Sequence, residues 1–237
     1  MTRRYLAFDI ETAADIPGDG GDWRHHRPLG ITCAAALGSD DREPITWHAQ
    51  QPDGTFAPRM SAEQVGAMVE YLGGRAAEGD TVLTWNGLGF DFDILAEESG
   101  AVAECRALAI DHVDMMFHVL CDRGFPVALA KAAHALGIPG KPDGMSGALA
   151  PTLWAQGKQR EVLDYVAQDV RIALGIARVC EERGTFLWTT RKGTRSSMPL
   201  ASGWLTVRDA MHLPEPDTSW MTNPLSRREV SAWLEPR

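Results

Sequence analysis

Residues 5–16 read YLAFDIETAADI and combine an apolar run with two acids, Asp9 and Glu11. Their apolar positions predict a buried strand, in which successive side chains point to opposite faces. Asp9 and Glu11 therefore lie on the same face. Two ionised carboxylates in a partly buried site repel each other, so one takes up a proton unless a cation lies between them. The stretch predicts a first strand that carries an acidic site.

The residue types indicate which cation such a site binds. Mg²⁺ and Mn²⁺ prefer carboxylate and water oxygens and keep positions open for a substrate phosphate. Paired acids without a nearby Cys or His favour one of these ions over zinc. Taken alone, an Asp-x-Glu pair on a strand is weak evidence for a metal site, and a structural role is favoured over it.

A second acidic segment reads TWNGLGFDFDIL, residues 84–95. Asn86 ends a predicted strand, and Asp91 lies in the first turn of the helix that follows, where the helix dipole favours an anion. Asp93 competes with Asp91 for the same role.

A third segment, LDYVAQDV at residues 163–170, lies in a predicted long helix. Tyr165 and Asp169 stand four positions apart and so share one helix face. A phenol and a carboxylate can therefore point into one site, although a buried Tyr beside a capping Asp is a common alternative.

The motifs FDIET, NGLGFD and YVAQD, in this order, resemble those of the DEDDy-type 3′-5′ exonucleases of the ribonuclease H-like superfamily. The chain looks most like a stand-alone polymerase B-type exonuclease domain, and the resemblance spans residues 5 to about 183. It implies a three-layer α/β/α fold with a mixed five-stranded sheet. It also implies an exonuclease domain at residues 1–184, with residues 185–237 as a small C-terminal extension packed on it.

The resemblance also implies roles for individual residues. Two divalent cations, Mg²⁺ or Mn²⁺, are expected about 4 Å apart, with Asp9 bridging them and the other acids completing the set. Tyr165, in place of the histidine of the DEDDh class, orients the attacking water. The expected metal ligands are Asp9, Glu11, Asp91 and Asp169.

Four further residues are candidates for substrate binding: Thr12, Asn86, Phe90 and Lys141. Thr12 can contact the terminal sugar, and Phe90 either packs beside the terminal base or belongs to the core. Lys141 either grips the substrate backbone from its Gly- and Pro-rich loop or is a solvated surface residue.

Other polar residues are expected to be structural. Asp111 and Asp114 follow the second motif, where strand-end or helix-cap roles are favoured over metal binding. Three histidines lack partners at metal-ligand spacing, and these are His112, His118 and His134.

Periodicity predicts the order of the remaining elements. Helices are expected at 61–79 with Ser61 as N-cap, at 90–99, 116–120 and 127–137, and from about 158 to 183, followed by a hairpin and two short helices. The expected strands are residues 4–11, 29–37, 44–49, 81–86 and 110–116, with hairpins joining the first three.

Two features of the C-terminal part invite a role in nucleic-acid binding. Trp188, Trp204, Trp220 and Trp233 fall in the last 50 residues, and packing against the catalytic domain is favoured over base stacking. The basic turn RKGTR at 191–195 is a candidate phosphate contact.

Composition bounds the class of protein. The 237 residues are 44% hydrophobic and carry a net charge of −9, with 20 Asp/Glu against 8 Lys/Arg in residues 1–120 and 7 against 11 in residues 121–195. A basic second half suits a phosphate partner, as does any solvated helix surface. Four dispersed cysteines, the absence of a secretory signal and the lack of a run of about 20 apolar residues predict a cytoplasmic protein without a membrane span.

The expected activity is hydrolysis of phosphodiester bonds from the 3′ end of single-stranded DNA, which releases 5′ mononucleotides. The same site could act on RNA, because nothing in the motifs reads a 2′-hydroxyl. A nucleic-acid-binding module without turnover is the alternative from another class.

Overall fold

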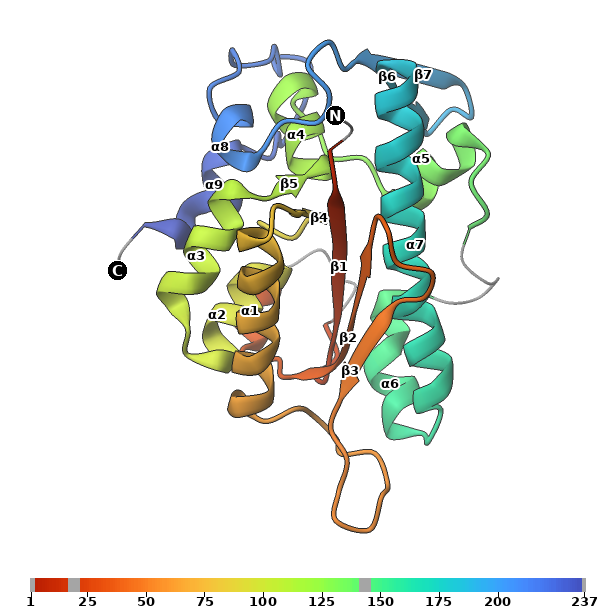
Figure 1. The fold of residues 1–237 in the computed structure, drawn as a ribbon. Helices are drawn as coiled ribbons and strands as arrows, with labels where there is room; N and C mark the ends of the chain where they lie inside the picture. The colour runs from red at the N-terminus through yellow and green to blue at the C-terminus, as the bar shows by residue number, and fades with distance from the viewer. Residues whose placement is uncertain (1–2, 17–21, 141–145, 236–237) are drawn as a thin grey trace.

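A computed structural model describes residues 3–16, 22–140 and 146–235 and contains a mixed five-stranded sheet in the order β3-β2-β1-β4-β5 (Figure 1). β2 runs antiparallel to β1 and β3, as predicted from the short hairpin links, whereas β4 and β5 run parallel to β1. The strands are β1 (Tyr5–Thr12), β2 (Ile31–Gly38), β3 (Ile45–His48), β4 (Thr81–Thr84) and β5 (Val113–Asp114).

Helices cover both faces of the sheet (Figure 1), which confirms the predicted three-layer ribonuclease H-like fold. One layer holds α1 (Ala62–Ala77), α2 (Asp91–Ser99) and α3 (Val102–Asp111). The other holds α5 (Leu129–Leu136), α6 (Ala150–Ala155) and α7 (Gln159–Arg183), while α4 (Met115–Arg123) follows β5.

The alternation of β1 divides the core in two. Tyr5 and Ala7 pack in the cluster that includes α7, and Asp9 and Glu11 continue this face. The opposite face packs against α1, α2 and α3, and its residues are Leu6, Phe8 and Ile10. The two carboxylates therefore point toward the α7 layer, as the period of two predicts.

Local signals fix the ends of two helices as expected. Ser61 caps α1 and forms a capping box with Gln64. α7 runs to Arg183 and stops at Gly184, whose φ of 62° is the left-handed conformation that glycine adopts without steric cost.

Two helices were missing from the predicted elements, and β5 is shorter than predicted. α3 and α6 were not expected, and β5 has only two residues because the segment before it is the end of α3. The buried residues of α3 are Cys105 and Ala109, so its sequence lacks a strong apolar stripe.

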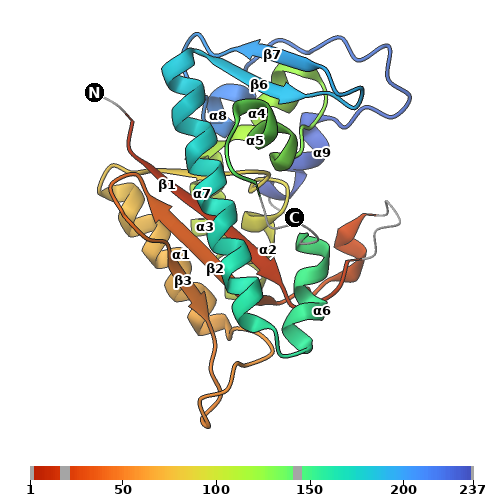
Figure 2. The same ribbon diagram turned by 90° about the vertical axis from the view of Figure 1, so that its right-hand side faces the viewer.

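The C-terminal residues form a hairpin, β6 (Thr185–Thr189) and β7 (Arg195–Pro199), and the two short helices α8 (Val207–Ala210) and α9 (Arg227–Ser231), as predicted. Figure 2 shows the hairpin at the C-terminal end of α7. Three tail tryptophans are buried, namely Trp188, Trp204 and Trp233, but packing was wrongly expected for Trp220, which is 67% exposed. The division at residue 184 stays a prediction.

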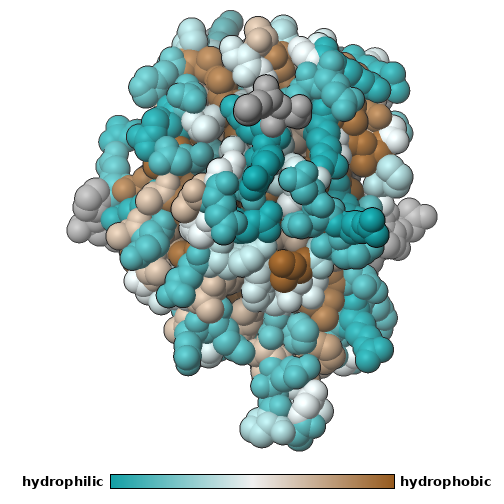
Figure 3. Space-filling model, viewed as in Figure 1, coloured by the Kyte–Doolittle hydropathy of each residue, from teal (hydrophilic) through white to brown (hydrophobic). Residues whose placement is uncertain are grey.

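The face in Figure 3 is mostly hydrophilic, and polar side chains interrupt its apolar areas. Among the helices of the described residues, none combines the length and apolar composition needed to cross a bilayer.

Candidate active site

A cavity of about 430 Å³ lies where β1 ends, between the first half of α7 and the loop that leads into α2. Segments that are far apart in the sequence meet in its wall. Five of the lining residues are those that the motifs single out, and they are Asp9, Glu11, Asp91, Tyr165 and Asp169.

Three carboxylates converge on one side of this cavity. Asp9, Glu11 and Asp169 each offer an oxygen atom within 4.8 Å of the others. Glu11 and Asp169 are each only 6% exposed, so their charges are held close together in a region of low dielectric. The face of β1 and the facing side of α7 produce this convergence.

Asp91 approaches from the opposite layer. It is the first residue of α2, and its carboxylate accepts a hydrogen bond from the backbone N–H of Ile10 at 3.2 Å. That N–H lies beyond Ala7, the last β1 residue paired with β4. Burial raises the pKa of Asp91 to about 7, and the charges of Asp114 and Asp169 act in the same direction. Asp91 thus joins the end of β1 to the rest of the site.

The structure separates Asp91, which the motif resemblance selects, from Asp93, its competitor two positions later in the sequence. Asp93 forms ion pairs with Arg24 at 3.2 Å and Arg27 at 2.5 Å and does not line the cavity. Its role is to attach the segment before β2 to α2.

The loop between β4 and α2 has a tightly constrained backbone. Asn86 has a φ of 75°, and a Cβ atom on Gly87 would lie 2.4 Å from Oγ1 of Thr84. The carboxylate of Asp114 accepts hydrogen bonds from the N–H groups of Asn86 and Leu88 at 2.9 and 3.0 Å. Asp114 also caps α4, so the predicted cap role is confirmed and extends to shaping the site loop.

Tyr165 lies beside the carboxylates. Burial raises the pKa of its phenol above the usual value, and the charges of Asp169, Glu11 and Asp9 raise it further. A Cβ atom on Gly147 would lie 3.9 Å from the phenol oxygen, so the backbone before α6 closes over this group. The phenol is therefore neutral and suited to hydrogen bonding.

Three of the four predicted substrate contacts line the same cavity. The hydroxyl of Thr12 donates to the carbonyl of Ala14 at 3.1 Å. Phe90 is half-buried, and its ring meets that of Trp23 edge-on at a centroid distance of 5.0 Å. Asn86 completes the set, whereas Lys141 lies outside the described residues.

Other lining residues had not been predicted. Trp85, Gly147 and Pro151 belong to the cavity wall. The run of glycines and prolines before α6 was the available signal, because such loops approach functional groups closely.

The remaining polar candidates lie outside the cavity. His112 bonds Thr84 at 3.0 Å and is buried in the core. The ring of His118 accepts a hydrogen bond from the Leu205 N–H, and Asp111 pairs with Arg208 at 2.7 Å. His134 bonds Thr189 at 3.0 Å, and the turn at 191–195 belongs to the hairpin at the far end of α7 (Figure 2).

The sequence matches the family model of the RNase H superfamily over residues 48–177, which is more than half of the chain. The chain belongs to the RNase H superfamily. The matched range includes Asp91, Tyr165 and Asp169, while the strand with Asp9 and Glu11 precedes it.

The fold of this RNase H superfamily chain is similar to that of a solved family B DNA polymerase from the hyperthermophilic archaeon Pyrobaculum calidifontis. The two share 20% sequence identity at a TM-score of 0.54, over 76% of this chain and 25% of the polymerase chain. At this identity the likeness concerns the fold. No curated protein matches the sequence.

The donor set of this RNase H superfamily site suits a hard divalent cation. Its ligand atoms are carboxylate oxygens, and among the described residues the group of potential metal-binding side chains is formed by Asp9, Glu11 and Asp169. A cation bound here offsets the mutual repulsion of these carboxylates. Family membership and the buried acidic cluster together support a metal-dependent nuclease.

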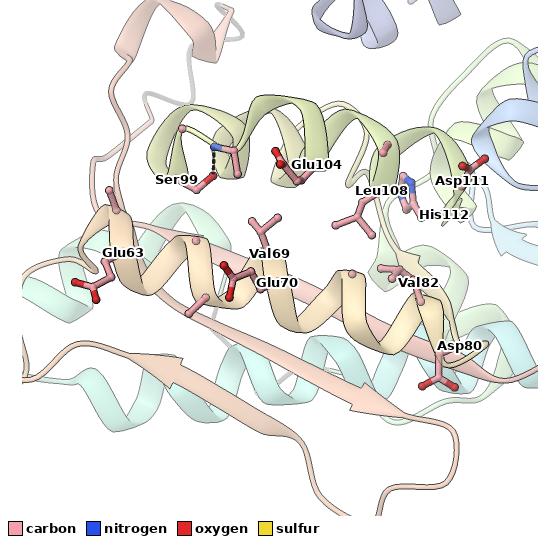
Figure 4. Close-up of a pocket in the computed structure, with 18 of the residues that line it drawn as sticks. Glu63, Val69, Glu70, Asp80, Val82, Ser99, Glu104, Leu108, Asp111 and His112 are labelled. Carbon is pink, nitrogen blue, oxygen red and sulfur yellow. Dashed lines mark hydrogen bonds between the residues drawn. The ribbon is translucent and has the colours of Figure 1, made fainter.

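A larger cavity of about 1170 Å³ lies elsewhere, between α1 and α3 (Figure 4). Its carboxylates, among them Glu63, Glu70 and Glu104, are spread along two helices rather than gathered at one point. Although this cavity is larger, its carboxylates do not converge, so we do not assign the catalytic centre to it.

Proposed function

We propose that this RNase H superfamily chain is a metal-dependent 3′-5′ exonuclease that acts on single-stranded DNA and releases 5′ mononucleotides. The observation that carries the proposal is the meeting of Asp9, Glu11, Asp91, Asp169 and Tyr165 in one cavity. These are the residues that the three motifs single out, and each comes from the element on which the motif places it.

The four carboxylates are proposed to hold two divalent cations, Mg²⁺ or Mn²⁺. Bound cations would lower the pKa of the attacking water and stabilise the charge that develops on the phosphate and the leaving 3′ oxygen. The burial of Glu11, Asp91 and Asp169 supports this assignment, because buried carboxylates gain most from a neutralising charge.

Tyr165 is proposed to orient the attacking water. Its raised pKa keeps the phenol protonated, so it serves as a hydrogen-bonding group rather than as a free base. It lines the same cavity as the carboxylates, which supports this role.

The proposed substrate is an unpaired 3′ end, whose terminal nucleotide would enter the cavity of about 430 Å³. Thr12, Asn86 and Phe90 in the wall are proposed to contact its sugar and base.

The test uses 5′-labelled and 3′-labelled oligonucleotides of matched DNA and RNA sequence, with Mg²⁺, Mn²⁺ or a chelator. Wild type is expected to shorten 5′-labelled DNA stepwise and to release the label of 3′-labelled DNA as a mononucleotide. The chelator and the Glu11→Gln substitution should stop both reactions.

The possible results separate the alternatives. Faster shortening of RNA would replace DNA by RNA as the substrate. Binding of the single strand without degradation in Mn²⁺ would instead indicate a binding module and overturn the proposed activity.

We also propose that the protein acts in the cytoplasm. Its four cysteines are buried and unpaired, a state that a reducing compartment maintains. Cell fractionation tests this location, and recovery of the protein in an oxidising compartment would contradict it.

A further inference from the structure

The C-terminal segment reaches the loop that carries the second motif. The indole Nε1–H of Trp233 donates a hydrogen bond to the carbonyl of Leu88 at 2.7 Å. Trp233 is only 8% exposed, so this bond is sheltered from water. A residue near the end of the chain is thereby joined to the loop between β4 and α2.

The segment around Trp233 is itself anchored to the catalytic domain. The guanidinium of Arg106, on α3, donates to the carbonyl of Trp233 at 3.0 Å and to that of Glu235 at 2.9 Å. Val230 lies so close to the loop that a Cβ atom on Gly89 would approach its side chain to 3.1 Å. The position of the indole is therefore fixed by α3 through Arg106 and by the packing of Val230 against the loop.

Both backbone groups of Leu88 are held by partners distant in the sequence. Asp114 accepts its N–H at 3.0 Å, and Trp233 donates to its carbonyl. Three residues later the chain reaches Asp91, whose carboxylate meets β1 at the Ile10 N–H. The location of Asp91 relative to β1 thus depends on how Leu88 is held.

We propose that Trp233 is a positioning residue of the active site. Through it, the C-terminal segment contributes to the geometry of the catalytic centre. The proposal rests on the proposed nuclease function. The indole holds the 86–90 loop through Leu88 and thereby keeps Asp91 in register with the carboxylates on β1 and α7. The nucleic acid itself is not contacted by Trp233.

The test compares Trp233→Phe with a matched control, Trp220→Phe. The first substitution keeps an aromatic ring but removes the N–H donor to Leu88. The second changes an exposed tail tryptophan whose indole bonds the Asp217 carbonyl at 3.1 Å. For each variant the kcat and KM for a single-stranded oligonucleotide are measured, together with amide hydrogen exchange of residues 86–92 and the Tm.

Trp233→Phe is expected to lower kcat about 10- to 100-fold with KM little changed, because a small displacement of a reacting group is costly. Exchange of the Leu88 amide should become about 10-fold faster, since its loop opens more often. The control, Trp220→Phe, should match wild type in kcat and in amide exchange. Arg106→Gln releases the same segment from α3 and should give the same changes in kcat and exchange. It therefore tests the proposal independently if the Trp233→Phe protein folds poorly.

Wild-type kcat and wild-type exchange in both Trp233→Phe and Arg106→Gln would overturn the proposal. A wild-type protein without nuclease activity would overturn the proposed function instead. In that case the exchange measurement still decides whether Trp233 holds the loop.

Discussion

Asp9 on β1 and Asp169 on α7 bring carboxylate oxygens within 4.8 Å of each other, although one lies in the first strand and the other in the longest helix. The side chains of Glu11, Asp91 and Tyr165 line the same cavity. Because several like charges share this site, changes to its residues should alter metal binding, stability and catalysis in predictable directions.

Asp9→Ala is expected to lower the hydrolysis rate by about 10³-fold or more, because the substitution removes a proposed metal ligand and its stabilisation of the reacting phosphate. The free energy of unfolding without metal should stay equal or rise by up to about 1 kcal/mol, since one of several repelling charges is lost. Rate assays and chemical denaturation in a chelator measure the two effects. Asp40→Ala, at the exposed turn after β2, is the control and should match wild type in both measurements. An Asp9→Ala protein that is active or unfolded would contradict the assignment.

Mn²⁺ is expected to raise the Tm of the wild-type protein. An ion present at 100 times its Kd stabilises a folded site by about 2.7 kcal/mol, which corresponds to roughly 5–10 °C for a chain of this length. Asp169→Asn should lose most of this shift. Melting curves with a chelator and with increasing Mn²⁺ provide the comparison, and equal shifts in both proteins would place the ion elsewhere.

Tyr165→Phe is expected to reduce kcat about 100-fold while leaving KM and the Mn²⁺ affinity unchanged, because the phenol orients water and holds neither metal nor substrate. Steady-state kinetics and isothermal titration with Mn²⁺ separate these quantities. Tyr71→Phe serves as the control, since its hydroxyl accepts a hydrogen bond from Arg75 at 2.8 Å outside the cavity. Loss of metal affinity in Tyr165→Phe would point to a different role.

Gly87→Ala is expected to lower both the free energy of unfolding, by about 1–3 kcal/mol, and the hydrolysis rate. The new Cβ atom would lie 2.4 Å from Oγ1 of Thr84, so the site loop must shift. Gly73→Ala, in the middle of α1 and with open space around its Cβ position, should instead raise the free energy of unfolding by about 0.5–1 kcal/mol. Denaturant titrations of both variants test the contrast, and a Gly87→Ala protein as stable as Gly73→Ala would argue against the loop geometry.

His118 is expected to make stability fall in acid. Burial lowers the pKa of its imidazole from 6.5 to about 4, so between these values the unfolded chain binds a proton more readily than the folded chain. The stabilisation is complete above pH 6.5 and is lost as the pH falls toward 4, by on the order of 3 kcal/mol.

His118→Gln removes this titration while its amide oxygen can still accept the Leu205 N–H. Denaturation of both proteins at pH 4, 5, 6 and 7 measures the difference. The free energy of unfolding should fall less steeply with acid in the variant, and parallel curves would show that His118 does not titrate in this range.

Much of the fold followed from local patterns. The alternation of β1, the hairpin from β2 to β3, the Ser61 cap and the apolar stripe of α7 each depend on residues close together in the sequence, and the structure contains all of them. The motif order placed the four acids and Tyr165 on the elements where they are found. These features are determined locally because backbone propensity and side-chain period operate over one or two turns or along one strand.

Other features depended on contacts between distant segments. Their positions leave Asp91 and Asp93 in competition, and the motif resemblance selects Asp91. The structure gives the physical basis of that choice, because Asp91 bonds the end of β1 whereas Asp93 pairs with Arg24 and Arg27. The bond from Trp233 to Leu88 likewise has no local signal.

Local patterns therefore predict the five strands of the sheet and most of its helices, and the motifs name the side chains that are proposed to carry the chemistry. Only the packed layers show how Asp91 and Asp93 are held, that Trp220 stays exposed and that Trp233 bonds the site loop. The physical reason is that hydrogen bonds and ion pairs between remote residues gain their strength from burial, and burial exists only after the layers have packed.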